Sequence, residues 1–359
     1  MGFDTHDAAA LARAVTLAER GRGEVEPNPP VGAVLYRRAE ILGEGFHAAY
    51  GAAHAEVAAL AGRERAPADA TLAVTLEPCS SRGPEKKQPP CVDALLRAGV
   101  RRVVVGELDP DPRHAGRGLA VLSAAGVEVV VAPAGTVPAR LLAEFRVQLA
   151  RDRPYVLLKW AQSLDGRWAD PTGRERWLSS EESRAQVHRL RACVDAILVG
   201  AGTVLADDPL LLARPPGPRP LVRIVVDARA RVSSSAQLFR TSDRGAVWWV
   251  TGREAPGAVA AGVERIGLAH PHDLGGELLP ELRRRGIARL LVEGGPTVAA
   301  AFLRAGVVDR AWVFVAPVLF GATAGEGPAL GRGLEVAARP RVDQVERCGC
   351  DAWFKLSWS

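Results

Sequence analysis

The sequence has no long apolar run and few cysteines for its length. No stretch of about 18 consecutive apolar residues occurs among the 359 residues, so no membrane-spanning helix is expected. The first residues, MGFDTHDAAALARAV, lack the basic-then-apolar order of a signal peptide. Five cysteines in so long a chain do not resemble a disulfide framework, and a subset is better explained as metal ligands or catalytic groups. These absences predict a cytoplasmic protein that does not contact membranes.

Lysine is scarce as well, with 4 lysines against 42 arginines in a chain of net charge +5. Residues 1–150 carry a net charge of −1 and residues 151–359 one of +6. The surplus of positive charge in residues 151–359 favours an anionic ligand there, whereas a nucleic-acid-binding surface would need a stronger basic patch. We therefore expect a small-molecule partner and no nucleic acid.

The length and composition indicate two globular domains. Hydrophobic residues make up 48% and charged residues 24%, which excludes a disordered or coiled-coil chain. A polar segment with a proline stop, Arg151–Pro154, follows a predicted helix, and a new apolar run begins at Tyr155. We predict domains at residues 1–150 and 151–359.

Apolar periodicity predicts alternating strands and helices in both parts, which is typical of α/β layered domains. In the first part, a helix over residues 7–20 precedes a hairpin that turns at Arg37–Glu40. The other predicted strands there are Thr71–Leu76, Arg102–Gly106 and Glu128–Val131, and the helices are Ala55–Ala61, Val92–Ala98, Leu119–Ala124 and Leu141–Ala150. In the second part the strands are Tyr155–Lys159, Ala196–Val199, Leu221–Val226, Ala246–Val250, Leu290–Val292 and Ala311–Val315, and the helices are Glu181–Ala192, Leu278–Arg285 and Thr297–Ala305.

A metal-site motif lies in the first part. His54 and Glu56 form H-A-E, and P-C occurs twice downstream, at Cys79 and at Cys91. One imidazole and two thiolates can bind Zn²⁺ and leave the fourth position open for a water, whose pKa the metal lowers toward about 7. Glu56, which is not a ligand, can then move protons between water and a leaving amine. The set predicts a zinc-dependent deaminase.

The remaining cysteines and two histidines are interpreted as structural. Cys193 lies in an apolar run and is expected to be a small core residue. Cys348 and Cys350 form C-G-C without further ligands nearby, so no metal role is expected. His47 and His114 lie near predicted turns and are interpreted as surface or pocket-rim residues.

Several motifs together resemble one enzyme family. In the first part they are PNPPVGAVL, GEGFH, HAEVAAL, TLEPCS, PPCVDALLRAGVRRVVVGELDPDP and AGRGLAVLSAAGVEV. In the second they are RPYVLLKWAQSLDGR, WLSSEESRAQVHRLRACVDAILVGAGTVLADDP and LVEGGPTVAAAFLRAGVVDRAWVFVAPVLFG. In this order they are similar to the bifunctional riboflavin-biosynthesis deaminase/reductases over nearly the whole chain.

The resemblance implies a fold and two consecutive reactions. The first domain would be a cytidine-deaminase-like three-layer α/β sandwich, and the second a dihydrofolate-reductase-like domain. Zinc-dependent deamination of 2,5-diamino-6-(5-phosphoribosylamino)pyrimidin-4-one would be followed by NADPH-dependent reduction of the ribosyl group. The product would be 5-amino-6-(5-phosphoribitylamino)uracil. The family also implies a homo-oligomer formed through the reductase domain.

Site residues follow from the same resemblance. The zinc ligands would be His54, Cys79 and Cys91, and the catalytic residues Glu56 and Lys159, with Asp165 in the S-L-D-G turn after the strand of Lys159. The residues that match NADPH contacts are Ala161, Trp177, Thr203, Asp207, Ala228, Gly295, Pro296 and Thr297. Those that match substrate contacts are Asn28, Arg191, Leu211, Arg214 and Glu293. The turn at Gly295 is expected to hold a cofactor phosphate at a helix N-terminus.

The sequence departs from the family at two places. Eleven residues separate Cys79 from Cys91, and the Ser80–Gln88 loop lacks the family's phosphate-binding histidine, for which Arg82, Lys86 or Lys87 could substitute. Glu175 stands where a small polar residue is usual and is expected to face solvent. Two alternatives stay open: a paralogue with another pyrimidine substrate or an inert deaminase half, and a nucleic-acid deaminase, against which the −1 charge of residues 1–150 argues.

Overall fold

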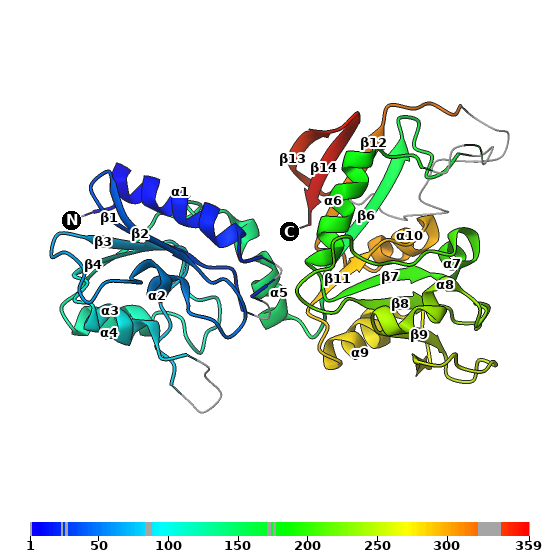
Figure 1. The fold of residues 1–359 in the computed structure, drawn as a ribbon, viewed down its shortest axis with the longest axis horizontal. Coiled ribbons are helices and arrows are strands. Elements are labelled where there is room, and N and C mark those ends of the chain that lie inside the picture. Colours follow the sequence, from blue (N-terminus) through cyan, green and yellow to red (C-terminus); the bar gives the residue numbers. More distant parts are fainter. Residues whose placement is uncertain are drawn as a thin grey trace. The chain divides into compact units, whose positions relative to one another are not determined.

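The computed structural model describes residues 2–22, 24–25, 28–82, 88–170, 174, 177–321 and 339–358. The chain divides into two compact units, Met1–Ala150 and Arg151–Ser359, which are described separately here (Figure 1). No helix in the described ranges is long and apolar enough to cross a membrane.

The first unit is built around a mixed sheet with the strand order β2-β1-β3-β4-β5 in the described residues. β1 is antiparallel to β2 and β3, whereas β3, β4 and β5 are parallel. Its strands are β1 (Gly32–Arg37), β2 (Glu40–Phe46), β3 (Thr71–Val74), β4 (Arg102–Val105) and β5 (Glu128–Val131). Its helices are α1 (Thr5–Glu19), α2 (Ala55–Ala59), α3 (Cys91–Arg97), α4 (Arg117–Ala124), the short 3₁₀ helix η1 (Ala139–Leu141) and α5 (Ala143–Ala150).

Strand alternation gives the first sheet two apolar faces, because successive side chains point to opposite sides. On one face, Val34, Ala73 and Val104 pack against the apolar residues of α1. On the other, Leu35, Leu72 and Val103 are among the residues that pack against α2, α3 and α4. Figure 1 shows α1 on one side of the sheet and α2 to α4 on the other. This is a three-layer α/β sandwich.

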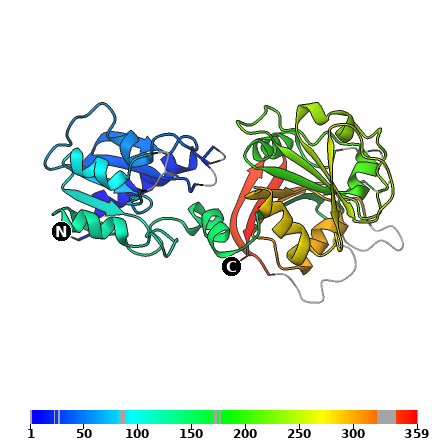
Figure 2. The same ribbon diagram turned by 90° about the horizontal axis from the view of Figure 1, so that it is seen from below.

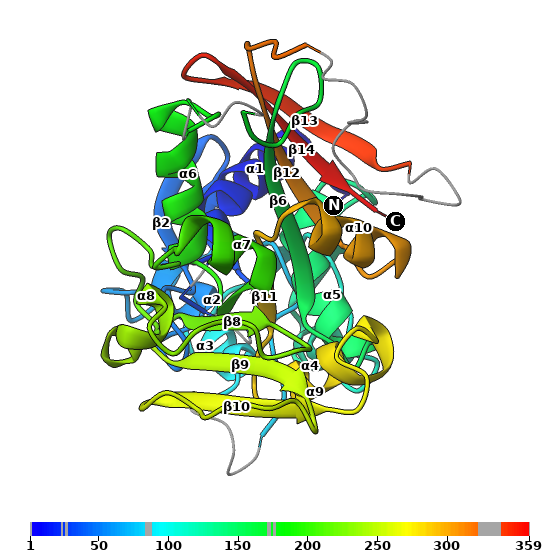
Figure 3. The same ribbon diagram turned by 90° about the vertical axis from the view of Figure 1, so that its right-hand side faces the viewer.

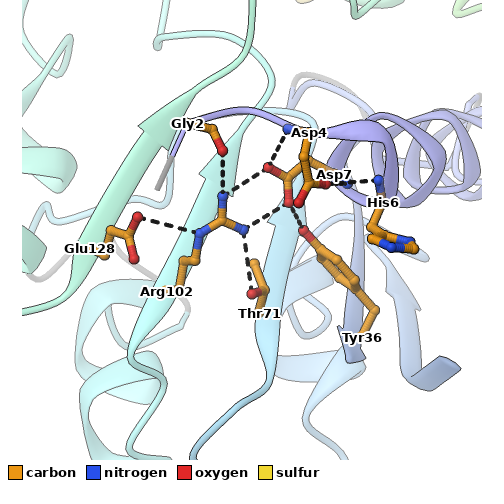
Figure 4. Close-up of polar contacts among 8 residues, drawn as sticks. All are labelled: Gly2, Asp4, His6, Asp7, Tyr36, Thr71, Arg102 and Glu128. Carbon is orange, nitrogen blue, oxygen red and sulfur yellow. Dashed lines mark hydrogen bonds and ion pairs between the residues drawn. The ribbon is translucent and has the colours of Figure 1, made fainter. Parts of the chain in front are cut away.

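A buried polar cluster fixes the start of α1 on the sheet (Figure 4). Asp7 closes a capping box with Asp4 at the helix N-terminus. Its carboxylate also accepts two hydrogen bonds from Arg102 on β4, at 2.7 and 2.8 Å, and one from the hydroxyl of Tyr36 on β1. Arg102 further pairs with Glu128 on β5 at 3.6 Å. The Asp7 carboxylate therefore joins the helix directly to β1 and β4, and Arg102 extends the cluster to β5.

The second unit has a larger sheet with the order β10-β9-β8-β7-β11-β6-β12-β14-β13 in the described residues. The strands from β10 to β12 are parallel, and β14 and β13 complete the sheet in antiparallel pairing. The strands are β6 (Tyr155–Ser163), β7 (Ala196–Gly200), β8 (Val222–Val226), β9 (Val247–Gly252), β10 (Val263–Leu268), β11 (Arg289–Val292), β12 (Arg310–Ala316), β13 (Arg341–Cys348) and β14 (Asp351–Ser357). The helices are α6 (Glu181–Ala192), α7 (Ala201–Asp207), α8 (Gln237–Arg240), the 3₁₀ helix η2 (Ser242–Arg244), the π-helix η3 (Leu274–Leu278), α9 (Leu279–Arg284) and α10 (Pro296–Arg304).

Helices cover both faces of this sheet, as buried parallel strands require. Leu190 of α6, Val204 of α7 and Phe239 of α8 pack on one face. Leu282 of α9 and Phe302 of α10 pack on the other. Figure 2 shows α9 and α10, in yellow and orange, together on their side, and Figure 3 shows α6, α7 and α8 opposite them.

The predicted helices and strands are present in both units, with bounds that differ by a few residues. The sequence patterns do not predict α7, α8, β10, β13 or β14. α7 follows β7 without a loop, so its residues read as a continuation of one apolar run. Cys193 is the C-cap of α6 and is half-buried rather than a core residue. Glu175 lies outside the described residues.

Candidate active sites

The three predicted zinc ligands lie together in the first unit. His54 is the N-cap of α2, Cys79 follows the carboxyl end of β3, and Cys91 is the first residue of α3. Their ligand atoms lie within 4.8 Å of one another, and no other such group of metal-binding side chains occurs in the described part of the chain. The His54 Nδ1 atom is 3.2 Å from the Cys91 Sγ and 3.6 Å from the Cys79 Sγ.

The electrostatics of the two thiols favour a metal. A hydrogen bond from Cys91, assisted by His54, lowers the pKa of Cys79 to about 4, whereas the bond to Cys79 and burial raise the pKa of Cys91. The backbone N–H of Cys91 also donates to the Cys79 Sγ at 3.4 Å. Without a cation Cys91 therefore keeps its proton, which a bound Zn²⁺ would displace, so that two thiolates and one imidazole nitrogen form the donor set. The residues present therefore fit the predicted metal.

Glu56 lies in the first turn of α2, two residues after His54, and is buried with 3% of its surface exposed. Burial, followed by the negative charge of Cys79, raises the pKa of Glu56 to about 7. A cation bound to the neighbouring ligands would favour the ionised carboxylate. A buried carboxyl that titrates near neutrality can both accept and donate a proton.

His47 belongs to this site although the sequence analysis placed it on the surface or a pocket rim. It is buried, its ring lies 5.0 Å from that of His54, and its Nε2 is 3.3 Å from the Asn28 amide nitrogen. The Nδ1 atom is 3.1 Å from the Ala53 carbonyl oxygen. The antiparallel pairing of Gly32 with Phe46 carries His47 back beside Asn28. The register of the predicted hairpin is the signal that could have found it.

Glu77 fixes the loop that carries Cys79. Its carboxylate accepts hydrogen bonds from the backbone N–H groups of Asp109 at 3.2 Å, Gly116 at 2.8 Å and Gly118 at 2.8 Å. Gly118 also approaches the Pro78 carbonyl so closely that a Cβ there would lie 2.1 Å from its oxygen. The loop after β4 thus holds Pro78, the neighbour of Cys79.

The loop that departs from the family is only partly described. Arg82 is exposed and pairs with Asp93 at 2.7 Å. Lys86 and Lys87 lie outside the described residues. Ser81 lies 3.0 Å from His114 Nδ1, which places that imidazole beside the loop.

In the second unit, a cluster of charges gathers several of the predicted reductase residues. Arg191 on α6 donates from Nε and Nη2 to Glu293, which follows β11, at 2.7 and 2.9 Å. Its remaining Nη1 donates to the Leu212 carbonyl at 3.2 Å. Burial opposes ionisation of Glu293, but Arg191 outweighs it and holds the pKa below its usual value. Arg191 therefore forms a buried, bidentate ion pair with Glu293.

Lys159 and His188 respond to the same charges. Burial lowers the pKa of Lys159, while Glu293 acts to raise it and Arg191 to lower it further. Burial also lowers the pKa of His188, assisted by Arg191 and by Arg214. Lys159 and His188 therefore both lie within electrostatic reach of Arg191 and Glu293. No sequence motif indicates His188 as a site residue.

The other predicted reductase residues lie at the carboxyl ends of the parallel strands and beyond. Thr203 on α7 accepts a hydrogen bond at 3.2 Å from the N–H of Gly295, the N-cap of α10, and Pro296 and Thr297 open that helix.

The remaining predicted residues are spread over several elements. Leu211 is buried in a left-handed conformation with φ of 54°. Trp177 is exposed and stacks with Arg184, while Asp207 ends α7. Ala161 is on β6, Ala228 lies just beyond β8, and Asp165 accepts backbone N–H groups of Phe320 and Gly321.

Known families match both units. Residues 4–107 match the family model described as the cytidine and deoxycytidylate deaminase zinc-binding region, and residues 154–354 match the RibD C-terminal domain. Curated proteins named riboflavin biosynthesis protein RibD are similar along most of their length. The protein of Aquifex aeolicus (strain VF5) is 39% identical over 346 residues and 94% of each chain, and that of Escherichia coli (strain K12) is 39% identical over 335 residues and 88% of each chain.

Solved structures agree with these matches. Acinetobacter baumannii RibD, form 1, is 33% identical, superimposes with a TM-score of 0.82 and covers 98% of each chain. A diaminohydroxyphosphoribosylaminopyrimidine deaminase/5-amino-6-(5-phosphoribosylamino)uracil reductase from Thermotoga maritima is 32% identical, with a TM-score of 0.80 and the same coverage.

Proposed function

The chain belongs to the RibD family of riboflavin-biosynthesis proteins, and we propose that its units, Met1–Ala150 and Arg151–Ser359, catalyse deamination and reduction in turn. The first reaction replaces the 2-amino group of 2,5-diamino-6-(5-phosphoribosylamino)pyrimidin-4-one with oxygen and releases ammonia. The second reduces the ribosyl group to give 5-amino-6-(5-phosphoribitylamino)uracil. The observation that carries the proposal is the convergence of His54, Cys79 and Cys91 beside the buried Glu56.

For deamination, His54, Cys79 and Cys91 would hold Zn²⁺, which supplies Lewis-acid activation of the attacking water. Glu56, buried in the first turn of α2 beside these ligands, accepts a proton from that water and delivers it to the leaving amine. The amide of Asn28, positioned by His47, orients the pyrimidine ring. Removing Glu56 should therefore spare the metal and stop the reaction.

For reduction, bound NADPH supplies a hydride, and the protein residues bind and orient the substrate. The exposed Arg214 binds the ribosyl phosphate, while Arg191 positions Glu293 against the sugar. Lys159 donates a proton to the ribosyl ring oxygen as the ring opens. Leu211 also contacts the substrate. The proposed NADPH contacts are Ala161, Trp177, Thr203, Asp207, Ala228 and the turn Gly295, Pro296 and Thr297.

Two assays on one sample test the proposal. With the diaminopyrimidinone substrate, the wild type should release ammonia, and with the deaminated substrate it should oxidise NADPH. Glu56→Gln should lower ammonia release by at least about hundredfold, with zinc content and NADPH oxidation unchanged. NADPH oxidation without ammonia release in the wild type would mean an inert deaminase half. Loss of zinc in Glu56→Gln would make Glu56 a ligand and overturn its assigned role.

The resemblance also supports two further expectations, a cytoplasmic location and a homo-oligomer formed through residues 151–359. Light scattering on the full chain, compared with a fragment that starts at residue 151, tests the second. Oligomers of equal order would support assembly through the reductase unit, and a monomeric fragment from an oligomeric full chain would contradict it.

A further inference from the structure

Arg223, the second residue of β8, is a charged side chain inside the core of the second unit, with 0% of its surface exposed. In the described part of the chain its hydrogen-bond partners are carbonyl and hydroxyl oxygens, without a carboxylate. Burying a charge without a counter-charge costs stability. The partners of Arg223 indicate what this cost maintains.

The two terminal nitrogens of Arg223 join separate segments. Nη2 donates to the carbonyls of Thr241 and Gly245 at 2.6 Å each, and Nη1 donates to the Thr241 hydroxyl at 2.9 Å. Thr241 is the C-cap of α8, and Gly245 is the C-cap of η2. Nη1 also donates at 3.2 Å to the carbonyl of Leu210, in the loop that follows α7. Arg223 therefore ties this loop to β8 and to the end of α8.

The loop after α7 contains a strained residue, Leu211, whose φ of 54° is left-handed. This conformation is unfavourable for a residue with a Cβ atom, and it persists only where the surrounding contacts impose it. The carbonyls on either side are both held: that of Leu210 by Arg223, and that of Leu212 by Nη1 of Arg191 at 3.2 Å. Two guanidinium groups, from β8 and from α6, clamp the backbone around Leu211.

Helix α8 also holds the start of the same loop. Asp208, the C-cap of α7, is left-handed as well, with φ of 41°. Its carboxylate accepts the N–H of Gln237, the first residue of α8, at 2.8 Å, and its carbonyl accepts the Gln237 Nε2 at 3.2 Å. The loop is therefore fastened to α8 twice, directly by Gln237 and at the other end of the helix through Arg223.

Leu211 is one of the residues to which a substrate contact is assigned above. Its side chain belongs with Leu190 and Val204 to one buried apolar cluster, so its backbone is the part left to meet the substrate. The left-handed conformation sets the direction of the two adjoining peptide groups. Arg191, which holds the next carbonyl, also pairs with Glu293. A change in this loop would therefore reach the substrate site directly.

We propose that Arg223 is a positioning residue of the reductase, which imposes through the Leu210 carbonyl the left-handed conformation of Leu211 that substrate binding requires. The inference rests on the proposed reductase function and names what fixes its substrate loop. Without Arg223 the loop relaxes toward an ordinary conformation, and the substrate has to restore the left-handed one. That cost weakens substrate binding and leaves NADPH binding unchanged.

Steady-state NADPH oxidation by the full chain with the deaminated substrate tests the proposal. Arg223→Lys keeps the charge, but one ammonium group cannot reach the same set of oxygens. This variant should raise the substrate KM by about tenfold and the NADPH KM by less than about twofold. Arg153→Lys is the matched control, because Arg153 is also buried in this unit but pairs with Asp309 at 2.6 Å. Its two KM values should both stay at those of the wild type.

Leu211→Ala and Leu211→Gly then separate the backbone conformation from the loss of the side chain. Both remove the side chain, but only glycine adopts the left-handed conformation without cost. While Arg223 holds the loop, that cost falls on the stability of the fold, and the two variants should have similar substrate KM values. In the Arg223→Lys background the cost falls on binding, so the alanine variant should have a substrate KM about fivefold above that of the glycine variant.

Other results overturn the inference in distinguishable ways. If Arg223→Lys raises both KM values together, or lowers the unfolding temperature with an unchanged substrate KM, the role of Arg223 is structural. An alanine-to-glycine ratio that is equal in both backgrounds would show that Arg223 does not act through Leu211. A wild type that does not oxidise NADPH with this substrate would overturn the reductase function itself.

A milder variant covers the case in which Arg223→Lys does not fold. Thr241→Val removes the hydroxyl that accepts from Arg223 Nη1, and it should raise the substrate KM by about threefold. An unchanged substrate KM in a folded Thr241→Val enzyme would contradict the proposal.

Discussion

At the scale of single residues, the reductase site shows how one ion pair sets the charge of a third group. Arg191 donates two hydrogen bonds to Glu293, and the charges of both residues influence the pKa of Lys159. Burial lowers the pKa of Lys159, and Glu293 limits that decrease. The proposed mechanism requires Lys159 as an ammonium, and the Glu293 carboxylate favours that charged form through its negative charge, without a direct contact.

Glu293→Gln should lower the pKa of Lys159 further, because the amide removes the negative charge that favours the ammonium. The pH dependence of amine labelling, resolved by peptide mass spectrometry, reports this pKa. The labelling midpoint of Lys159 should move to lower pH in Glu293→Gln and to higher pH in Arg191→Gln. Lys355, which pairs with Glu346 at 3.0 Å on the β13–β14 hairpin, is the internal control. Midpoints that move together for both lysines would contradict the assignment.

At the scale of elements, the buried carboxylate of Asp7 links α1 to β1 and β4, and Arg102 carries the cluster on to Glu128 of β5 (Figure 4). Burial would raise its pKa, but the hydrogen bonds from Arg102 and Tyr36 outweigh burial and hold the pKa below its usual value. A carboxyl with a lowered pKa stabilises the fold above its unfolded pKa, and this stabilisation is lost as the pH falls through the folded value. The packing of α1 is therefore sensitive to acid.

Asp7→Asn should destabilise the first unit by about 3 kcal/mol at pH 7, because the largely buried Arg102 loses its two shortest charged hydrogen bonds and keeps as an ion pair only the 3.6 Å contact with Glu128. The stability of the wild type should fall as the pH drops below about 4, and that of Asp7→Asn should change less over the same range. Thermal unfolding followed from pH 7 to pH 2 measures both effects. Glu44→Gln is the matched control, since its pair with Arg13 is largely exposed and should contribute under about 1 kcal/mol. Equal losses in the two variants would contradict the central role of Asp7.

The sequence predicted elements best where periodicity and capping agree. The capped apolar stripe of α1, the turn at Arg37–Glu40 and the buried run of β11 all lie close to their predicted bounds. β13 was missed because its residues are mostly exposed and show no apolar alternation. Spacing and residue type sufficed to select His54, Cys79 and Cys91 as one group. His47 and the pairing of Arg191 with Glu293 depend on contacts between distant elements, which local patterns do not report.

At the scale of the whole molecule, the two proposed sites draw their residues from different compact units. The proposed metal ligands belong to Met1–Ala150, and the Arg191–Glu293 cluster belongs to Arg151–Ser359. A ligand that binds only the folded state stabilises the unit that holds it. Zinc and NADPH should therefore act on separate unfolding transitions.

Chelation of zinc from the full chain should abolish ammonia release and lower the unfolding temperature of one transition. NADPH oxidation with the deaminated substrate should persist, and a second transition should keep its temperature and its stabilisation by NADPH. Differential scanning calorimetry with both activity assays measures this, and added Zn²⁺ should restore the first transition. Loss of both activities on chelation would show that the reductase unit also depends on the metal.

The close approach of Gly118 to the Pro78 carbonyl limits how this enzyme can vary. Position 118 is on helix α4, where most residues other than proline are compatible with the backbone, yet every side chain would meet that oxygen. When all codons are introduced at position 118 and cells that depend on this enzyme are selected for growth without added riboflavin, only glycine should be recovered. Substitutions elsewhere in α4 can then change the surface of the helix, whereas position 118 must stay glycine.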